Sequence, residues 1–325
     1  MADGQFIMTR ALFSQLNFSP FEKLKLVAGV RFEQVPSYKI ISQSVYQTDE
    51  PVTNEGVYDR ERIETIPRLA IIYYLNKHNI FKFLYGAAIN RPSFFQNTRN
   101  ALDPVHNNLK PERIHTLEIN YITTLTKGVT LNLSLFRNTL DNLITRIVRF
   151  NDEGQYESWS GNAGKMVTNG AEMAINIEPV DNLRIELSGS LQKTKDKREN
   201  YKNIPVAYSP NFLGYVRASY RIAPFTISLT GDYVDKMETY WDETILNPDS
   251  TYGNRIGEPV DSYFIFGCNV RFDNIFLLNG LYLNLKCSNL FNDTVRYPTY
   301  TNNSWADAGT LGIGRQFLLT MGYKF

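Results

Sequence analysis

The stretch from residue 183 to residue 192 reads LRIELSGSLQ. Apolar residues and glycine occupy its odd positions, and the even positions hold Arg184, Glu186, Ser188 and Ser190 before a glutamine. A period of two places the two sets on opposite faces of a β-strand. Because one set is apolar and the other is polar, the stretch predicts a strand that has two different environments on its two sides.

The same alternation recurs along the chain, in about thirteen segments of roughly ten residues each. Strands of soluble proteins usually have only ~5–6 residues, whereas a tilted strand that crosses a bilayer needs ~9–11. The sequence therefore predicts an all-β fold, a transmembrane antiparallel β-barrel. The clearest segments are residues 24–33, 129–135, 171–177, 183–192, 212–222, 225–233, 264–272, 281–287 and 317–325.

Short and long connections alternate between these segments. Outer-membrane barrels have short periplasmic turns and long extracellular loops, so the alternation gives the predicted barrel a direction across the membrane. Its apolar set would then face lipid, and its polar set a wet or plugged lumen. The short connections are residues 19–23, 76–79, 126–128, 179–182, 223–224 and 273–280, and the long ones are residues 34–66, 91–112, 137–167, 193–210, 235–260 and 292–312.

The strand count does not close a barrel by itself. Counting back from a periplasmic Phe325 through an odd number of strands puts Met1 at the extracellular end, whereas single-chain bacterial barrels normally have an even number. We therefore expect residues 1–325 to be the C-terminal portion of a larger barrel. Its first strand (around residues 6–18) and its last (residues 314–325) should not pair regularly with each other.

Composition argues against several other classes of protein. The 34 Lys and Arg residues against 33 Asp and Glu leave a net charge of +1, which gives no reason to expect nucleic acid as a partner. Two cysteines and three histidines are too few for a disulfide scaffold or a histidine-based metal centre. His115 and Glu118 are three residues apart, so on a strand they lie on opposite faces. We expect no catalytic site, no metal and no cofactor.

Several short motifs, in order along residues 20–325, resemble those of the TonB-dependent receptor family. They are Asn90-Arg-Pro-Ser93 followed by Asn108-Leu-Lys-Pro-Glu112, then Asn169-Gly-Ala-Glu172, Asn289-Leu-Phe-Asn292, Gly314-Arg-Gln-Phe317 and the terminal Gly322-Tyr-Lys-Phe325. None is specific alone, but their order and their places on the predicted barrel make the signal strong.

The resemblance implies a plugged outer-membrane barrel of about 22 strands in a Gram-negative bacterium. It implies a receptor that binds a scarce nutrient at its extracellular loops, with uptake energised by TonB. The family's N-terminal plug, its TonB-contacting segment and about nine early strands have no counterpart in residues 1–325, so this chain alone is not expected to transport. Outer-membrane lipid and the barrel assembly machinery, which would recognise the terminal aromatic Phe325, are further expected partners.

Five residues are candidates for binding the ligand. Trp159, Trp241 and Trp305 fall in long loops, with Tyr240 beside Trp241. Rigid aromatic surfaces of this kind are common at binding sites, although interface anchoring or loop packing explains them too. Arg271 is the fifth candidate.

Arg271 belongs to a set of charges predicted to face the lumen. These charges could bind an anionic solute, contact a plug or pair with one another across neighbouring strands. The set is Arg31, Glu118, Glu172, Arg184, Glu186, Arg217, Arg271 and Arg315. A separate basic run, Lys193, Lys195, Lys197 and Arg198, either meets lipopolysaccharide phosphates or forms a solvated loop face.

Three other functions remain open on the sequence. A passive porin-like barrel keeps the fold without the energy coupling, an outer-membrane enzyme would need a reactive serine or histidine, and a β-rich binding protein would need no membrane. The ligand itself cannot be read from the loops; a small molecule, a glycan or a peptide would each fit this architecture.

The two cysteines give a test of register. If the hairpin around residues 273–280 is symmetric, Cys268 lies directly opposite Cys287, and both alternate with the lipid-facing set. Directly opposed Cβ atoms lie ~4.5–5.5 Å apart, further than a disulfide favours. We expect neighbouring, outward-facing and unbonded thiols.

Overall fold

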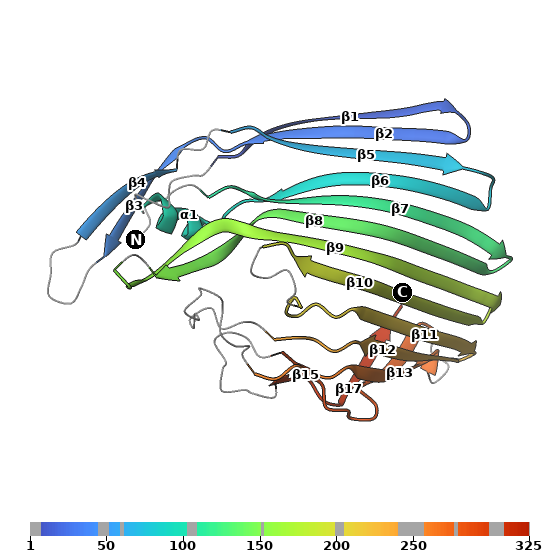
Figure 1. Cartoon of the computed structure of the whole chain (residues 1–325). Coiled ribbons are helices and arrows are strands. Elements are labelled where there is room, and N and C mark those ends of the chain that lie inside the picture. The colour runs from blue at the N-terminus through green and yellow to red at the C-terminus, as the bar shows by residue number, and fades with distance from the viewer. Residues whose placement is uncertain are drawn as a thin grey trace.

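In a computed structural model, thirteen strands form one antiparallel sheet (Figure 1). The structure describes residues 8–44, 52–58, 62–102, 109–150, 153–198, 205–239, 257–275, 279–298 and 309–324. The predicted all-β, incomplete barrel is confirmed. In sheet order the strands are β1 (Arg10–Phe21), β2 (Leu24–Gln34), β5 (Glu64–Tyr74), β6 (Asn79–Asn90), β7 (Glu112–Thr126), β8 (Val129–Phe150), β9 (Tyr156–Val180), β10 (Leu183–Asp196), β11 (Phe212–Ile222), β12 (Phe225–Val234), β13 (Tyr263–Asp273), β14 (Leu281–Ser288) and β17 (Gln316–Tyr323).

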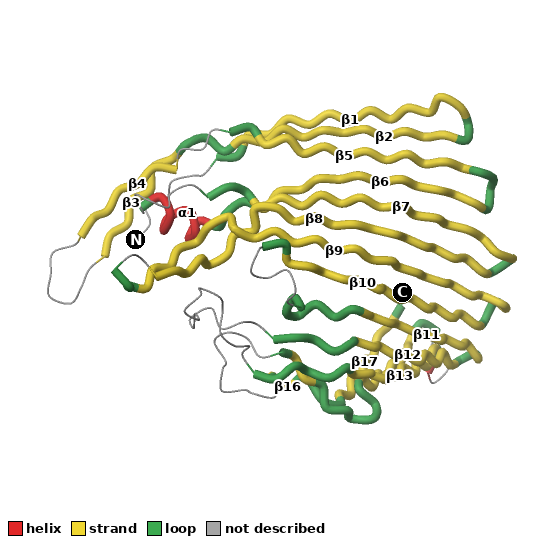
Figure 2. Tube along the Cα trace, viewed as in Figure 1, coloured by secondary structure: helices red, strands yellow, loops and turns green. Residues whose placement is uncertain are grey.

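The tight turns lie together at one end of the sheet, as the alternation of connections predicts (Figures 1 and 2). The β7–β8 turn shows why its sequence is restricted. Gly128 has φ +77°, and a Cβ atom there would lie 2.1 Å from the carbonyl oxygen of Glu178. Only glycine adopts this conformation without strain and leaves space for that oxygen.

The opposite end of the sheet carries the larger connections. One holds the hairpin of β3 (Tyr38–Ser44) and β4 (Val52–Tyr58), and the next holds the helix α1 (Phe94–Ala101). The short strands β15 (Arg296–Tyr297) and β16 (Thr310–Leu311) pair at the same end. No helix in the part of the chain that the structure describes is both long and apolar enough to span a bilayer.

Residues 137–167 differ from the prediction of a long polar loop. β8 runs on to Phe150 and β9 starts at Tyr156, so most of this segment is a hairpin that extends the sheet. A register shift separates the extension from the main sheet between Leu140 and Leu143, where Asn142 has φ +59°. Beyond this bulge the strands show no apolar–polar alternation, since residues 143–148 read Leu-Ile-Thr-Arg-Ile-Val.

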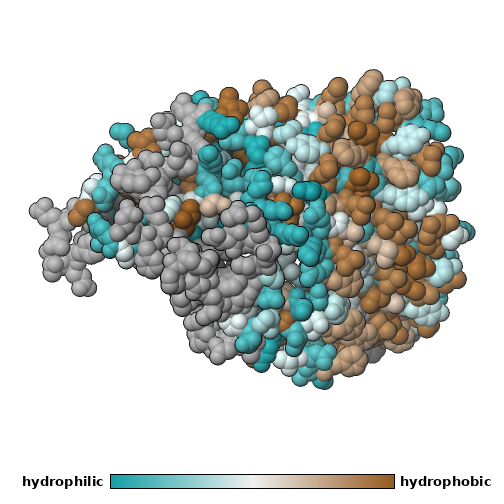
Figure 3. Space-filling view, in the orientation of Figure 1, coloured by the Kyte–Doolittle hydropathy of each residue, from teal (hydrophilic) through white to brown (hydrophobic). Residues whose placement is uncertain are grey.

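The two faces of the sheet have the predicted composition. On the apolar face, Ile119 and Leu135 are 53% and 62% exposed. On the polar face, Asn120, Ser134 and Ser228 are 5%, 8% and 5% exposed. The apolar side chains therefore cover the outer, convex face, and the polar ones lie in the concavity. Figure 3 shows an apolar band toward the end with the tight turns, and a hydrophilic strip between that band and the loops.

β1 and β17 form the two edges of the sheet and do not pair with each other, as predicted. Every residue of β1 is exposed. The first strand begins at Arg10 in the structure, later than the expected residue 6, and the residues before Met8 lie outside the described part.

Cys268 and Cys287 are direct cross-strand partners, and both thiols are free, as predicted. The expectation that both sulfurs lie open to lipid is wrong for Cys287, which is only 6% exposed. The turn that follows β14 bends back over this outer face, because Phe291 stacks on Phe266 with ring centroids 5.4 Å apart.

Candidate functional site

The β3–β4 hairpin and α1 form a small packed unit at the loop end. Val35, Ile40 and Tyr58 make a buried apolar cluster with Tyr38 packed against it. The rings of Tyr38 and Tyr58 stack with centroids 4.9 Å apart, and the Asn97 amide of α1 donates a hydrogen bond to the Tyr38 hydroxyl at 3.2 Å. Burial raises the pKa of the Tyr38 phenol, against the lowering effect of that hydrogen bond. The unit is thus an ordered surface beside the mouth of the sheet.

The start of α1 explains the residues Asn90-Arg-Pro-Ser93. Ser93 caps the helix: its hydroxyl accepts the Gln96 backbone N–H at 3.3 Å, while the Gln96 side chain accepts the Ser93 N–H at 2.8 Å. Arg91 pairs with Glu33 of β2 at 3.0 Å, and Arg31 reaches the same carboxylate at 2.8 Å. The motif therefore joins the helix to the wall of the sheet.

The second motif of the pair is tied to its neighbours by hydrogen bonds. Glu112 accepts the Asn90 amide at 2.8 Å and the Ile144 backbone N–H at 2.8 Å. Asn162 binds both backbone groups of Lys110, with its oxygen 2.6 Å from the N–H and its amide 2.8 Å from the carbonyl. These contacts fix the β6–β7 connection against the β8–β9 extension.

Trp159 lies on that extension, in β9, opposite Ile147 of β8. It therefore belongs to a strand and not to the loop that the sequence suggested, although it remains at the loop end and is only partly buried. Tyr240, Trp241 and Trp305 lie outside the described residues.

Arg271 lies far along β13, two residues before the strand ends at the tight turn. Its guanidinium pairs with Asp273 at 2.8 Å and covers the ring of Tyr282 at 3.9 Å. The structure therefore does not bring Arg271 together with Trp159, which lies at the opposite end of the sheet.

Other charges on the polar face pair with one another or bond to neighbouring polar groups, in line with the predicted cross-strand pairing. Arg184 contacts Glu186 at 2.8 Å, and Arg217 approaches the same carboxylate at 3.9 Å. Glu118 accepts the hydroxyl of Ser134 at 2.9 Å. The opposite charges of these side chains therefore compensate one another on this part of the polar face.

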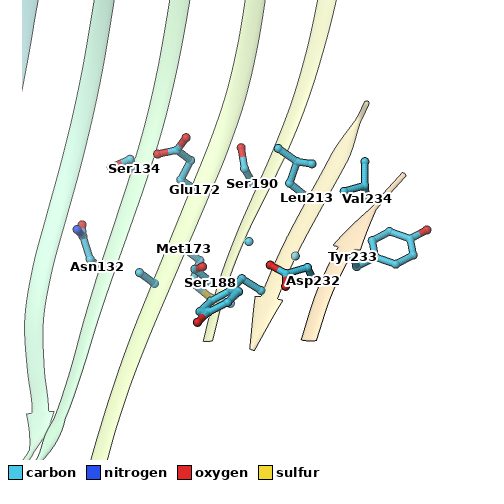
Figure 4. A pocket seen from close by; sticks show the side chains of 14 residues that line it. Asn132, Ser134, Glu172, Met173, Ser188, Ser190, Leu213, Asp232, Tyr233 and Val234 are labelled. Carbon is cyan, nitrogen blue, oxygen red and sulfur yellow. The ribbon is translucent and has the colours of Figure 1, made fainter. Parts of the chain in front are cut away.

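A cavity of about 410 Å³ on this wall was not expected from the sequence (Figure 4). Asn132, Ser134, Glu172, Ser188 and Asp232 project into it from β8, β9, β10 and β12. Each strand contributes one or two small or polar residues, so the signal is spread over about 100 residues of sequence. Hydroxyl, amide and carboxylate groups suit a polar solute or the polar surface of a protein segment.

Among the residues that the structure describes, no three His, Cys, Asp or Glu side chains come together in a way that could hold a metal ion. His115 and Glu118 occupy opposite faces of β7, as expected; the His115 ring contacts the Tyr85 hydroxyl at 3.0 Å, while Glu118 bonds Ser134.

Comparison with protein families gives one match. A family model described as TonB dependent receptor-like, beta-barrel, matches residues 3–290. No curated protein matches the chain significantly.

Solved structures share the fold over 98% of this chain. The ferric-catecholate import receptor Fiu from E. coli superposes with a TM-score of 0.74 at 17% identity, over 44% of its own length. The ferric enterobactin receptor PfeA from Pseudomonas aeruginosa gives 0.73 at 15% identity over 45%, and the siderophore receptor PiuA from Acinetobacter baumannii gives 0.70 at 15% over 43%. The chain thus spans less than half the length of these structures.

Proposed function

The chain belongs to the TonB-dependent receptor β-barrel family, and on this basis we propose that it forms the C-terminal portion of an outer-membrane nutrient receptor. Members of this family are receptors and transporters rather than enzymes, and their barrels reside in the outer membrane of Gram-negative bacteria. We assign this chain to the same membrane. The plug and the early strands would belong to the rest of the protein, which agrees with the open thirteen-stranded sheet.

The observation that carries the proposal is the difference between the two ends of the sheet. Tight turns close one end, while an ordered layer that contains the β3–β4 hairpin, α1 and the β8–β9 extension stands at the other (Figure 1). In an outer-membrane barrel the larger connections are extracellular. A ligand arriving from outside would meet this layer first, and Trp159, Tyr240, Trp241 and Trp305 would contact it there.

Arg271 would act at a different step. Because it lies beside the turns, on the side that faces the periplasm in this orientation, we propose that it contacts the plug or the solute leaving the barrel. Passage past the plug would be energised by TonB through the N-terminal part of the protein.

Iron-carrying siderophores are the ligand class we propose. Fiu, PfeA and PiuA are named as receptors for ferric catecholate, ferric enterobactin and a siderophore. The polar side chains of the concave wall would suit a polar chelate better than an apolar solute.

The test uses cells that express the full-length protein, with ⁵⁵Fe-labelled ferric enterobactin as the probe. We expect saturable uptake that stops when TonB is deleted, and binding that Trp159→Ala weakens about tenfold, within the range for an aromatic anchor. Uptake that persists without TonB would identify a passive barrel, and absence of binding would refute the siderophore class. Arg184→Gln, in the polar wall, serves as the control for binding at the mouth.

A further inference from the structure

The outer face of the sheet changes abruptly from apolar to basic between two neighbouring rows of side chains. Direct cross-strand partners form the first row, Leu135, Ala171, Leu191 and Phe212. Two residues further toward the loops, Arg137, Asn169 and Lys193 are also direct partners. Since residues two apart along a strand share a face, both rows point outward.

An apolar groove of about 800 Å³ includes the first row and extends from it toward the tight turns. Its lining includes Leu135, Ala171, Leu187, Gly189 and Phe212. Gly189 lies directly opposite Gly214, which removes two side chains from this part of the wall. A Cβ atom at either glycine would be 3.3 Å from the Phe212 ring, so the ring lies close against the backbone and leaves the wall indented.

A basic cavity, also of about 800 Å³, lies immediately beyond the groove and shares Leu191 with it. Lys193, Lys195 and Lys236 line it together with Asn169 and the carboxylate of Glu238. All three lysines are exposed. One acidic group thus faces three cations, and Arg137 adds a fourth cation beside Asn169.

Two other cations near the loop end have acidic partners. Lys165 binds Asp141 at 2.8 Å, and Arg198 binds Asp196 at 2.6 Å. Arg137, Lys193, Lys195 and Lys236 form no ion pair within the part of the chain that is described. Four cations that have no ion pair among the described residues, next to an apolar groove, suit an anionic, partly apolar partner.

We propose that the apolar groove and the basic cavity together bind one lipopolysaccharide molecule through its lipid A part. Acyl chains would occupy the groove, and the sugar phosphates would contact Arg137, Lys193 and Lys195, since charge-assisted hydrogen bonds to phosphate are strong. The inference rests on the proposed function for its orientation. With the loops outside, the row of Arg137, Asn169 and Lys193 lies one step outward from the apolar row, at the level of headgroups in the outer leaflet. Figure 3 shows a hydrophilic strip on this side of the apolar band.

The test measures lipid binding to the full-length protein. The protein is purified in detergent, stripped of lipid and titrated with bisphosphorylated hexa-acyl lipid A, and bound lipid is counted by native mass spectrometry. We expect Arg137→Gln combined with Lys193→Gln and Lys195→Gln to weaken binding at least about tenfold. A matched variant at the tight turns, Lys23→Gln with Lys77→Gln and Lys127→Gln, removes the same charge and should bind as the wild type does.

Two lipids test the chemistry on the unmodified protein, so the result does not depend on the folding of a variant. Dephosphorylated lipid A and phosphatidylethanolamine should each bind at least about tenfold more weakly than lipid A. Equal binding of either lipid, or an unchanged affinity in the triple variant at Arg137, Lys193 and Lys195, would overturn the proposal. Neither assay contains iron or TonB, so a failure of siderophore uptake leaves the lipid result standing, and the reverse also holds.

Discussion

Glu112 is the residue whose loss should affect the loop end most directly. Replacing it with alanine leaves the Asn90 amide and the Ile144 N–H without their acceptor. A hydrogen bond to a charged group contributes ~1.5–3 kcal/mol, and the partly buried Ile144 N–H accounts for most of the loss because water can reach the exposed Asn90 amide. We expect Glu112→Ala to lower the free energy of unfolding by about 2 kcal/mol or more, measured by denaturant titration of the full-length protein. Glu112→Gln keeps an oxygen for Ile144 and should recover most of it. Equal stability of the alanine variant and the wild type would contradict this role.

Gly128 tests the geometry of a single turn. An alanine there must adopt φ +77° and place its Cβ 2.1 Å from the Glu178 oxygen. We expect Gly128→Ala to destabilise the protein by ~1–3 kcal/mol, seen as a lower unfolding midpoint. Gly86 is the matched control, because nothing lies within 4 Å of its Cβ position; Gly86→Ala should change stability by no more than ~0.5 kcal/mol. Similar unfolding midpoints for the two variants would show that the turn accommodates the added Cβ without strain, which would contradict the prediction.

At this scale the sequence predicts positions along strands better than contacts between distant segments. The pairing of Cys268 with Cys287 follows from the period of two and one symmetric hairpin. The hydrogen bonds of Asn162 to Lys110 join residues 52 positions apart. Nothing local marks that asparagine, since its partners are backbone groups that any residue would supply.

The β8–β9 extension is the element whose stability depends most on one side chain. Asn162 holds Lys110 and also donates to the Asn142 carbonyl at 2.7 Å, beside the bulge. We expect Asn162→Ala to loosen the extension, so that trypsin cleaves at Lys110 and Arg146 several-fold faster, because these bonds then open locally. Asn182→Ala, at a tight turn on the far end, should leave those cleavage rates unchanged. Equal cleavage in both variants would mean that strand pairing alone holds the extension.

The extension also shows where prediction of elements fails. Residues 183–192 could be placed on a strand because lipid and lumen impose opposite chemistry on their two sides. Beyond the bulge, residues 144–150 pair in regular register with residues 156–162, but neither face is required to be apolar outside the bilayer. A polar sequence is therefore compatible with both a loop and an exposed hairpin, and it does not predict which one forms.

The whole molecule has two unpaired edges, and this limits what residues 1–325 do alone. Among the strands that the structure describes, none pairs with the outer side of β1 or of β17, and each unpaired backbone group costs several kcal/mol in lipid. We expect this chain, expressed by itself, to aggregate or fail to insert, measured by heat-modifiable mobility on gels. The full-length protein should show the folded, faster band. A monodisperse folded monomer of residues 1–325 would contradict the need for further strands.

The overall architecture could be predicted from the sequence because one rule, alternation with long and short connections, applies to every hairpin. The candidate site could not. Trp159 turns out to lie on a strand, and the cavity beside Glu172 and Asp232 is assembled from five strands. The groove beside Phe212 depends on two glycines that are direct partners on neighbouring strands.

Because the tight turns lie together at one end, the barrel wall and the ligand-contacting connections can change independently during evolution. Each hairpin's register is fixed where its turn is shortest, so insertions or deletions in the opposite connections do not slip the strands. Lineages can therefore exchange these surface segments while the wall stays the same. The same freedom would let a pathogen vary the part of the receptor that antibodies and bacteriophages reach, without losing the barrel.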